Sequence, residues 1–179
     1  YLRAIGALVM GMWAVAAGAQ TTGSLAKQGD ITPLCGTKPA VVALTDATAF
    51  ARRIQRPDVD VLALHKPPGH GVWMYPQLFS LFRSLRPAIV HTRNIAALEA
   101  VVPAWLAGVP VRVHSEHGRD IGDLTGANRR YQWMRRMYRP FVNHYVALSR
   151  DLSEYLVDRV RVPPTAVSQF YNGVDTERF

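Results

Sequence analysis

Short apolar runs recur along the chain with enough residues between them for a helix. After residue 39 there are five such runs, at residues 40–45, 59–64, 88–91, 111–114 and 145–148. The segments between them space their apolar residues as a helix does. Strands that alternate with helices pair in parallel through right-handed crossovers. The pattern therefore predicts an α/β fold with a doubly wound parallel sheet.

Cap and breaker residues place three of the helices. Residues 73–85 carry an apolar stripe that ends before a proline, because the residue ahead of proline disfavours the α conformation. Asn94 is a candidate N-cap for a helix over residues 95–107, which ends at a glycine. Ser149 caps the next helix. A β-type run from Val167 then leads to an Asn-Gly turn, where the chain stops as another unit should begin.

The N-terminal stretch has two interpretations. Residues 1–20 place Arg3 ahead of an apolar segment rich in Ala and Gly, which suits a secretory signal or a truncated first strand, turn and buried helix. We favour the strand, because that part of an α/β domain is equally apolar. Residues 20–38 are polar without periodicity and predict a loop.

Charge and cysteine content narrow the function classes. The 179 residues suit one domain, and 21 Lys+Arg against 13 Asp+Glu leave a net charge of +8. This excess attracts anions such as the phosphates of nucleotides, lipid headgroups or nucleic acid. Because Cys35 is the single cysteine, the chain has no internal disulfide and no cysteine zinc site, and a reducing compartment fits.

The strand end at residues 91–94 is the first place that could carry chemistry. It passes into a helix start, where backbone N–H groups and the helix dipole favour an anionic or hydroxyl-rich ligand. Arg93 is a candidate contact for such a ligand. Asn94 taken alone is more simply explained as a helix cap.

Residues 114–120 are the second place. Strand alternation puts His114 and Glu116 on one face and Ser115 and His117 on the other, which disfavours a metal site. What remains is a histidine, a glycine that lets a ligand approach the backbone, and an adjacent Arg-Asp pair, at the edge of the sheet where ligands bind. At this point a structural and a functional histidine are equally good explanations.

A basic amphipathic helix is predicted over residues 128–140. One arc holds Arg129, Arg135, Arg136 and Arg139, and most of the other holds Tyr131, Trp133, Met134, Met137 and Tyr138. The helix is either an ordinary surface helix whose aromatic face packs on the sheet, or an element attracted to an anionic membrane surface or a lipid-linked phosphate. We favour the surface helix slightly, because a face packed on its own domain is not free to enter lipid.

Five stretches match one family when taken together, and they are residues 43–50, 89–94, 111–120, 145–152 and 171–175. They resemble the N-terminal half of a glycosyltransferase family four enzyme, closest to the sugar transferases of bacterial exopolysaccharide and PEP-CTERM systems. The resemblance implies two Rossmann-like domains facing a cleft in the GT-B arrangement. It also implies retention of anomeric configuration, no cofactor and no required metal. We accordingly divide the chain into a poorly matching segment at 1–38, a Rossmann-like acceptor domain at 39–165 and a crossing at 166–179 to a missing donor domain.

The same resemblance implies roles for particular residues. His117 matches the family's cleft histidine, and we assign it the catalytic role of polarising a sugar or acceptor hydroxyl. The residues expected to bind substrate are Arg93, Asn94, Glu116, Gly118, Arg119, Asp120 and Ser149. Among these, Arg119 would contact an anion, and Asp120 would accept a hydroxyl or pair with Arg119. Gly6 is a remnant of the family's glycine-rich turn at the donor phosphates, where Ala7 adds an unwanted Cβ.

We therefore expect part of a retaining hexosyltransferase that moves a sugar from a nucleotide-sugar donor to a glycan or lipid-linked acceptor in exopolysaccharide biosynthesis. The expected location is the cytoplasm, with peripheral contact to an anionic inner membrane, and the fragment alone is expected to be inactive. The alternative is an exported, non-catalytic module that binds a phospho-ligand or nucleic acid. Nucleic acid is disfavoured, because the aromatic residues and arginines share a helix instead of forming a stacking groove.

Overall fold

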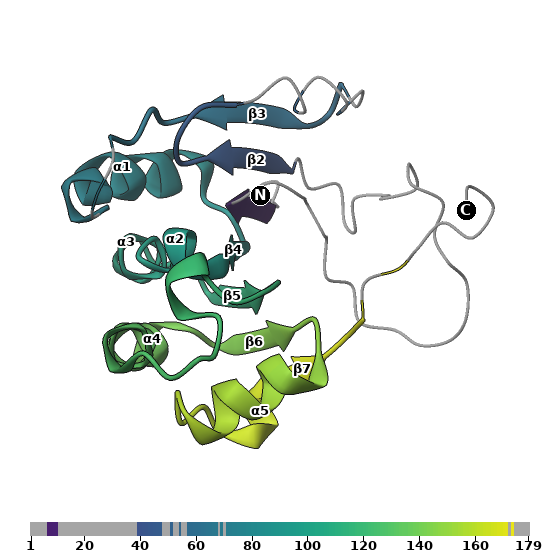
Figure 1. The fold of residues 1–179 in the computed structure, drawn as a ribbon. Helices are drawn as coiled ribbons and strands as arrows, with labels where there is room; N and C mark the ends of the chain where they lie inside the picture. Colours follow the sequence, from purple (N-terminus) through teal and green to yellow (C-terminus); the bar gives the residue numbers. More distant parts are fainter. Residues whose placement is uncertain are drawn as a thin grey trace.

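The computed structural model describes residues 7–10, 39–47, 51, 54, 57–67, 69, 71–171 and 173, of which 7–10 are described by their backbone alone. Within these residues, seven parallel strands form one sheet in the order β3-β2-β1-β4-β5-β6-β7 (Figure 1). Their bounds are β1 (Ala7–Met10), β2 (Ala40–Ala43), β3 (Asp60–Ala63), β4 (Ile89–Arg93), β5 (Val111–Glu116), β6 (His144–Ala147) and β7 (Val167–Gln169). The doubly wound α/β sheet predicted from the apolar runs is confirmed.

Strand β1 lies inside this sheet, third in the strand order. It pairs with β2 on one side and with β4 on the other, so residues 7–10 form a first strand as expected. At one edge β7 pairs with β6, so the sheet takes in strands on both sides of the expected 39–165 range. The expected turn at Gly6 and the loop at residues 20–38 lie outside the described residues.

The described helices connect successive strands. Their bounds are η3 (Val72–Met74), α1 (Tyr75–Leu85), α2 (Asn94–Leu98), α3 (Val101–Leu106), η4 (Ile121–Asp123), α4 (Arg129–Tyr138), η5 (Arg139–Phe141), α5 (Arg150–Asp158) and η6 (Pro164–Ala166). The helix predicted over 73–85 is confirmed as η3 followed by α1. The predicted cap at Ser149 is also confirmed, because its hydroxyl accepts the Leu152 N–H at 3.1 Å.

The helix predicted over residues 95–107 is two helices instead. Helix α2 ends at Leu98, and α3 begins at Val101 after a turn that starts at Glu99. Pro103 explains the interruption, because it has no N–H to donate to the carbonyl of Glu99 four residues earlier. The prediction of one continuous helix was wrong, since it relied on a candidate cap at Asn94 and a closing glycine and did not consider the missing N–H of Pro103.

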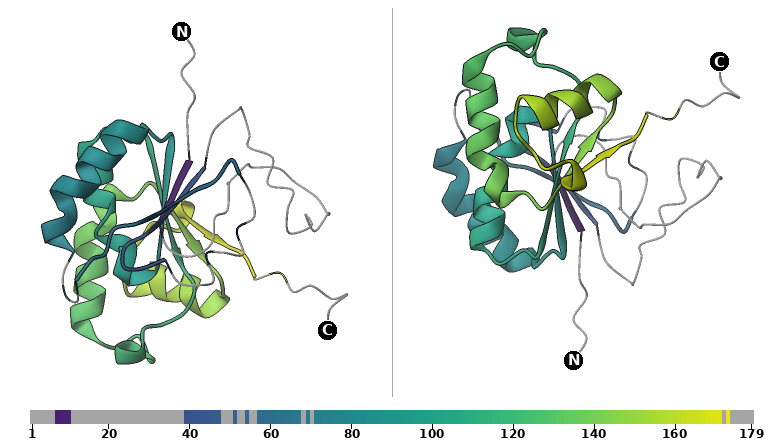
Figure 2. Two further views of the ribbon diagram at one scale, coloured as in Figure 1. Left: turned by 90° about the horizontal axis from the view of Figure 1, so that it is seen from above. Right: turned by 90° about the horizontal axis from the view of Figure 1, so that it is seen from below.

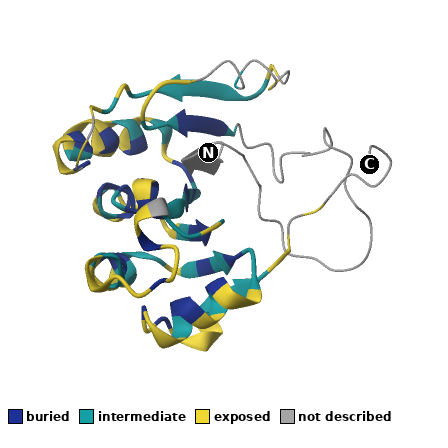
Figure 3. Cartoon of the chain, in the orientation of Figure 1, coloured by how far each residue is buried: buried dark blue, intermediate teal, exposed yellow. Residues whose placement is uncertain are grey.

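Helices α1 to α4 lie along one side of the sheet (Figure 2). Apolar side chains of α1, α2 and α3 form a core with β2 and β4 that includes Leu78, Phe82 and Val90, each at most 2% exposed. A second cluster packs α5 against β6 and β7 around Leu156. Buried residues accordingly follow the strands and the helix faces turned toward them (Figure 3). These two clusters determine which face of each strand the helices cover.

The chain changes direction across the sheet between β1 and β4. Strands β2 and β3 follow β1 on one side, whereas β4 to β7 continue on the other. In open α/β sheets a ligand binds outside the carboxyl ends of the strands at such a switch point. Strands β4 and β5 end side by side, with Thr92 opposite His114 and Arg93 opposite Ser115. The two strand ends that carry candidate chemistry therefore meet.

Candidate functional site at the ends of β4 and β5

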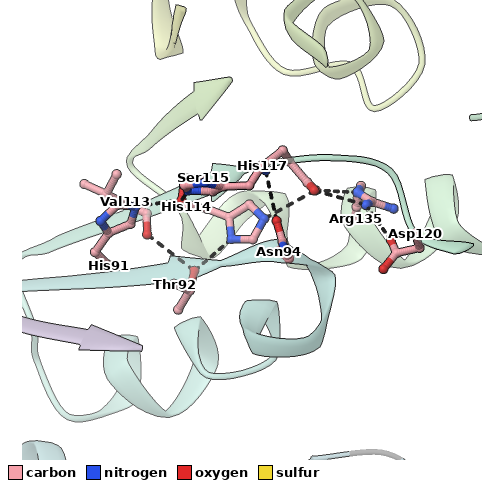
Figure 4. A network of polar contacts seen from close by, with 10 residues as sticks. His91, Thr92, Asn94, Val113, His114, Ser115, His117, Asp120 and Arg135 are labelled. Atoms are coloured by element: carbon pink, nitrogen blue, oxygen red, sulfur yellow. Dashed lines mark hydrogen bonds and ion pairs between the residues drawn. The ribbon is translucent and has the colours of Figure 1, made fainter. Parts of the chain in front are cut away.

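Alternate residues at the end of β5 point to opposite faces of the sheet. His114 and Glu116 lie on the helix side, where each is at most 1% exposed and Glu116 contacts α4. Ser115 and His117 face the other way, and Ser115 meets His91 of β4 there (Figure 4). The assignment of these β5 residues to two faces was predicted from strand alternation and is confirmed.

A serine joins two histidines on the face away from α4. The Ser115 Oγ atom lies 2.9 Å from Nε2 of His91 and 2.9 Å from Nε2 of His117. The hydroxyl has a single proton, so it donates to one ring and accepts an N–H from the other. Nδ1 of His117 has no hydrogen-bond partner within the described residues. This nitrogen is therefore the ring atom available to a ligand.

Both histidine rings are held in the neutral form. Burial lowers the pKa of His91 to about 4, and the positive charges of neighbouring groups, including Arg93, add to the effect. Burial likewise lowers the pKa of His117 to about 4, again with a contribution from Arg93. At neutral pH the pair therefore offers hydrogen-bonding nitrogens, without positive charge, to a ligand.

Asn94 holds the end of β5 in place. Its Oδ1 atom accepts the backbone N–H of His117 at 2.9 Å. Its side chain makes no capping hydrogen bond to α2, and its backbone φ of +55° lies in the left-handed region that asparagine tolerates. The prediction that Asn94 caps the helix was wrong, because the neighbouring strand presents an N–H that the local sequence does not reveal. Asn94 therefore positions the residue that carries the free ring nitrogen.

A buried ion pair occupies the opposite face. Arg135 of α4 is 3% exposed, and it donates from Nε to Glu116 Oε1 at 2.6 Å and from Nη2 to Oε2 at 3.2 Å. The same Nη2 reaches Asp120 Oδ2 at 3.1 Å. His114 extends the network, with Nε2 3.4 Å from Glu116 and Nδ1 2.8 Å from Thr92 Oγ1 (Figure 4). The network links β4, β5, α4 and the loop that follows β5.

Glu116 is a charged structural residue in this network. Burial alone would raise its pKa, but the hydrogen bonds and charges of His114 and Arg135 outweigh burial and lower the pKa. Burial would lower the pKa of Arg135, and Glu116 and Asp120 reverse that direction. The prediction that Glu116 contacts substrate was wrong, because the side chain is sealed on the helix side with both carboxylate oxygens bonded to Arg135.

Arg119 and Asp120 are adjacent in sequence but do not pair. Arg119 Nη2 donates to Asp151 Oδ2 at 2.7 Å, and its guanidinium lies 4.7 Å from the centre of the Tyr155 ring. Asp120 pairs with Arg135 instead. Of the two roles predicted for Asp120, the pairing with Arg119 was wrong, because the two side chains turn to different helices, α5 and α4. An anionic ligand at Arg119 would have to compete with Asp151.

The arcs predicted for α4 also differ from the structure. Arg135 points inward, whereas Trp133 is 63% exposed and Met137 is 42% exposed. The prediction divided the helix by side-chain type and was wrong for these three residues. Arg135 lies on the inward arc because it donates hydrogen bonds to the buried Glu116 carboxylate. Trp133 and Met137 consequently face outward.

Gly118 and Arg93 are the other predicted site residues near His117. A Cβ on Gly118 would meet no atom within 4 Å, so the backbone after His117 is accessible. Arg93 ends β4, and burial lowers its pKa. A groove of about 750 Å³ between α4 and α5 is lined by Arg119 and Trp133 among others, but not by His117. In the described part of the chain, no three His, Cys, Asp or Glu residues are grouped so as to hold a metal ion.

The fold of the chain matches the N-terminal portion of GT-B glycosyltransferases. A glycosyltransferase from Rickettsia africae superposes with a TM-score of 0.60 at 13% identity, over 79% of this chain and 36% of its own. The Anabaena protein HepE in complex with UDP and glucose gives 0.58 at 15% identity, over 76% and 37%. Residues 34–178 match the Glycosyltransferase Family 4 domain, and the chain belongs to that family.

A curated relative acts on a lipid-linked acceptor. The chain is 28% identical over 105 residues to the Escherichia coli UDP-Gal:alpha-D-GlcNAc-diphosphoundecaprenol alpha-1,3-galactosyltransferase. The match covers 57% of this chain and 27% of that enzyme, so the chain spans only between about a quarter and somewhat more than a third of the relatives described. Among the described residues, no helix is long and apolar enough to cross a membrane.

Proposed function

We propose that the protein carrying this chain is a retaining glycosyltransferase that moves a sugar from a nucleotide-sugar donor to a glycan or lipid-linked acceptor. The observation that carries the proposal is the neutral imidazole of His117 at the carboxyl edge of the sheet, whose Nδ1 atom has no hydrogen-bond partner among the residues that the structure describes. Membership of family 4 and the E. coli galactosyltransferase support a sugar-nucleotide donor and a lipid diphosphate acceptor. We place the donor mainly on a second domain and the acceptor on this one, in exopolysaccharide synthesis.

The reaction needs precise placement of a hydroxyl more than it needs a strong base. The acceptor oxygen bonds to the anomeric carbon, the bond from that carbon to the diphosphate oxygen breaks, and the hydroxyl proton passes to the departing diphosphate. A neutral imidazole orients a sugar or acceptor hydroxyl through Nδ1 without adding charge to the site. Ser115 fixes the ring from the other nitrogen, and Asn94 fixes the backbone beneath it. We also assign Arg93, which ends β4, and Gly118, which follows His117, to substrate binding.

The experiment replaces His117 in the full-length protein. We expect His117→Ala to lower the turnover of sugar transfer from a UDP-sugar to a GlcNAc-diphospholipid acceptor by about 100-fold or more. The free energy of unfolding should change by only about 1 kcal/mol, because one hydrogen bond is lost. Unchanged turnover in the variant would remove His117 from the site.

Two further variants make the test specific. His144→Ala is the matched control, because Nε2 of His144 lies 2.8 Å from the Ser168 hydroxyl and the variant loses this contact. His144 begins β6, so it lies at the opposite end of the sheet from the carboxyl ends of β4 and β5. The variant should keep full turnover. Gly118→Ala adds a methyl group into open space, so it should fold normally and raise the KM for the acceptor.

A further inference from the structure

His91 of β4 is linked to His117 of β5 by one hydroxyl group (Figure 4). The Ser115 Oγ atom lies 2.9 Å from Nε2 of each ring. Ser115 is only 1% exposed, so its hydroxyl is sealed from bulk water. The two rings are the hydrogen-bond partners of this hydroxyl within the described residues. We call the three side chains the histidine–serine relay.

The hydroxyl couples the tautomers of the two rings. Both rings are neutral at neutral pH, so each carries one N–H and one nitrogen lone pair. Ser115 donates its proton to one Nε2 atom and accepts an N–H from the other. The rings therefore hold opposite tautomers. If Nε2 of His91 carries the proton, the proton of His117 lies on Nδ1, and the reverse arrangement exchanges the two.

Burial favours one of these two arrangements. Neither Nδ1 atom has a hydrogen-bond partner among the residues that the structure describes. Buried N–H groups without a partner are rare in folded proteins, and unpaired acceptors are tolerated more readily. His91 is the more deeply buried of the two rings, so its Nδ1 atom should be the unprotonated one. Its proton then lies on Nε2, where Ser115 accepts it.

We propose that His91 is a positioning residue that keeps the proton of His117 on Nδ1 by donating from its own Nε2 atom to Ser115. Ser115 in turn donates to Nε2 of His117, and Nδ1–H of His117 becomes the donor that a ligand meets. His117 therefore binds an oxygen that accepts a hydrogen bond, such as a sugar hydroxyl oxygen, and leaves the proton of that hydroxyl in place. This role rests on the proposed function, in which the hydroxyl proton passes to the departing diphosphate and not to a base.

Two side chains of similar length and shape at His91 test the relay. Gln donates an N–H to Ser115, whereas the thioether of Met accepts weakly and donates nothing. In NMR spectra of the ring nitrogens of the 179-residue chain, we expect the proton of His117 on Nδ1 in the parent and in His91→Gln. In His91→Met it should move to Nε2, because His117 is then the ring that has an N–H for Ser115 to accept.

His144→Met is the matched control for the spectra. Nε2 of His144 lies 2.8 Å from the Ser168 hydroxyl, so the variant breaks the same kind of contact away from the relay. The tautomer of His117 should not change in this variant. A proton on Nε2 of His117 in the parent chain, or an unchanged tautomer in His91→Met, would overturn the proposal.

Turnover of the full-length protein tests the positioning role itself. In the sugar-transfer assay, His91→Met should lower kcat by about tenfold or more, whereas His91→Gln should stay within about twofold of the parent, as for partners that fix the tautomer of another residue. A side chain that serves only for packing predicts the reverse order, because Met is more apolar than Gln. Parent-like turnover in His91→Met would therefore exclude the role of His91.

The assay also separates this inference from the proposed function. If His117→Ala loses turnover while His91→Met keeps it, the proposed function stands and His91 has no positioning role. If His117→Ala keeps full turnover, the proposed function fails and the positioning role fails with it, although the spectra still report the relay. Loss in His117→Ala and His91→Met, with His91→Gln close to the parent, is the result that we expect.

Discussion

The two faces of β5 carry similar residue types in opposite states. On the helix side, His114 and Glu116 are sealed, and Arg135 neutralises the carboxylate through two hydrogen bonds. On the other side, Ser115 joins two uncharged rings and leaves one nitrogen of His117 free. One strand therefore supplies a fixed structural charge and an adaptable binding group from consecutive residues. The difference lies in what covers each face, since α4 covers the first.

The comparison also explains why the pKa values diverge across one strand. Burial acts on both faces and favours the neutral form of every group. Only Glu116 has a cation within hydrogen-bonding distance, so its pKa is lowered despite burial. His117 has Arg93 nearby instead, and burial together with Arg93 lowers its pKa although the charge of Glu116 acts in the opposite direction. A partner of opposite charge therefore marks the structural face, and its absence from the rings marks the candidate binding face.

Breaking the ion pair should have the largest effect. Arg135→Ala leaves the Glu116 carboxylate buried without its partner, and we expect it to lower the free energy of unfolding by about 3–5 kcal/mol. Denaturant titration of the chain measures this. Arg150→Ala is the matched control, because it breaks the exposed pair with Glu154 and should change stability by about 0.5 kcal/mol or less. Equal losses in the two variants would show that α4 does not seal this face.

Loosening the other face should have a smaller effect. Asn94→Ala loses the hydrogen bond to the His117 N–H and places an alanine at φ +55°, so it should lower the free energy of unfolding by about 2 kcal/mol. Asn94→Gly loses only the hydrogen bond and should lose about half as much. Both variants should speed hydrogen exchange at the His117 amide. A glycine variant as unstable as the alanine variant would contradict a role for the backbone conformation.

Local patterns predicted the fold and the division of β5. Five apolar runs placed strands, and the period of two separated His114 and Glu116 from Ser115 and His117. These signals are local, because a strand's alternation and a helix's stripe are complete within a few residues. A first strand near the N-terminus was also predicted and is confirmed as β1, although its side chains and the turn at Gly6 lie outside the described residues.

Partners distant in sequence were not predictable in the same way. Arg135 and Glu116 are 19 residues apart, and nothing in the α4 pattern says which of its arginines turns inward. Asn94 resembled a cap because it stands at a strand-to-helix junction, yet its partner is the N–H of His117, 23 residues away. His91 was noted only as part of a strand end. His91 and Ser115 lie on neighbouring parallel strands, and that adjacency was the signal that could have placed His91 in the site.

Acid should separate the two faces, with the smallest effect of the three tests because water reaches the half-buried rings and screens them. An unfolded histidine takes up a proton near pH 6.5, whereas His91 and His117 do so near pH 4 in the folded chain. Between these values the unfolded state binds more protons, so the free energy of unfolding must fall as pH falls.

The lowered pKa of Glu116 affects stability only below its ordinary value of 4.5. Denaturant titrations at about pH 7 and about pH 5.5 therefore report His91 and His117 without a contribution from Glu116. The double variant His91→Gln/His117→Gln should lose this pH dependence while His144→Gln keeps it. A dependence that survived the double variant would place the titrating groups elsewhere and leave the neutral state of the two rings without support.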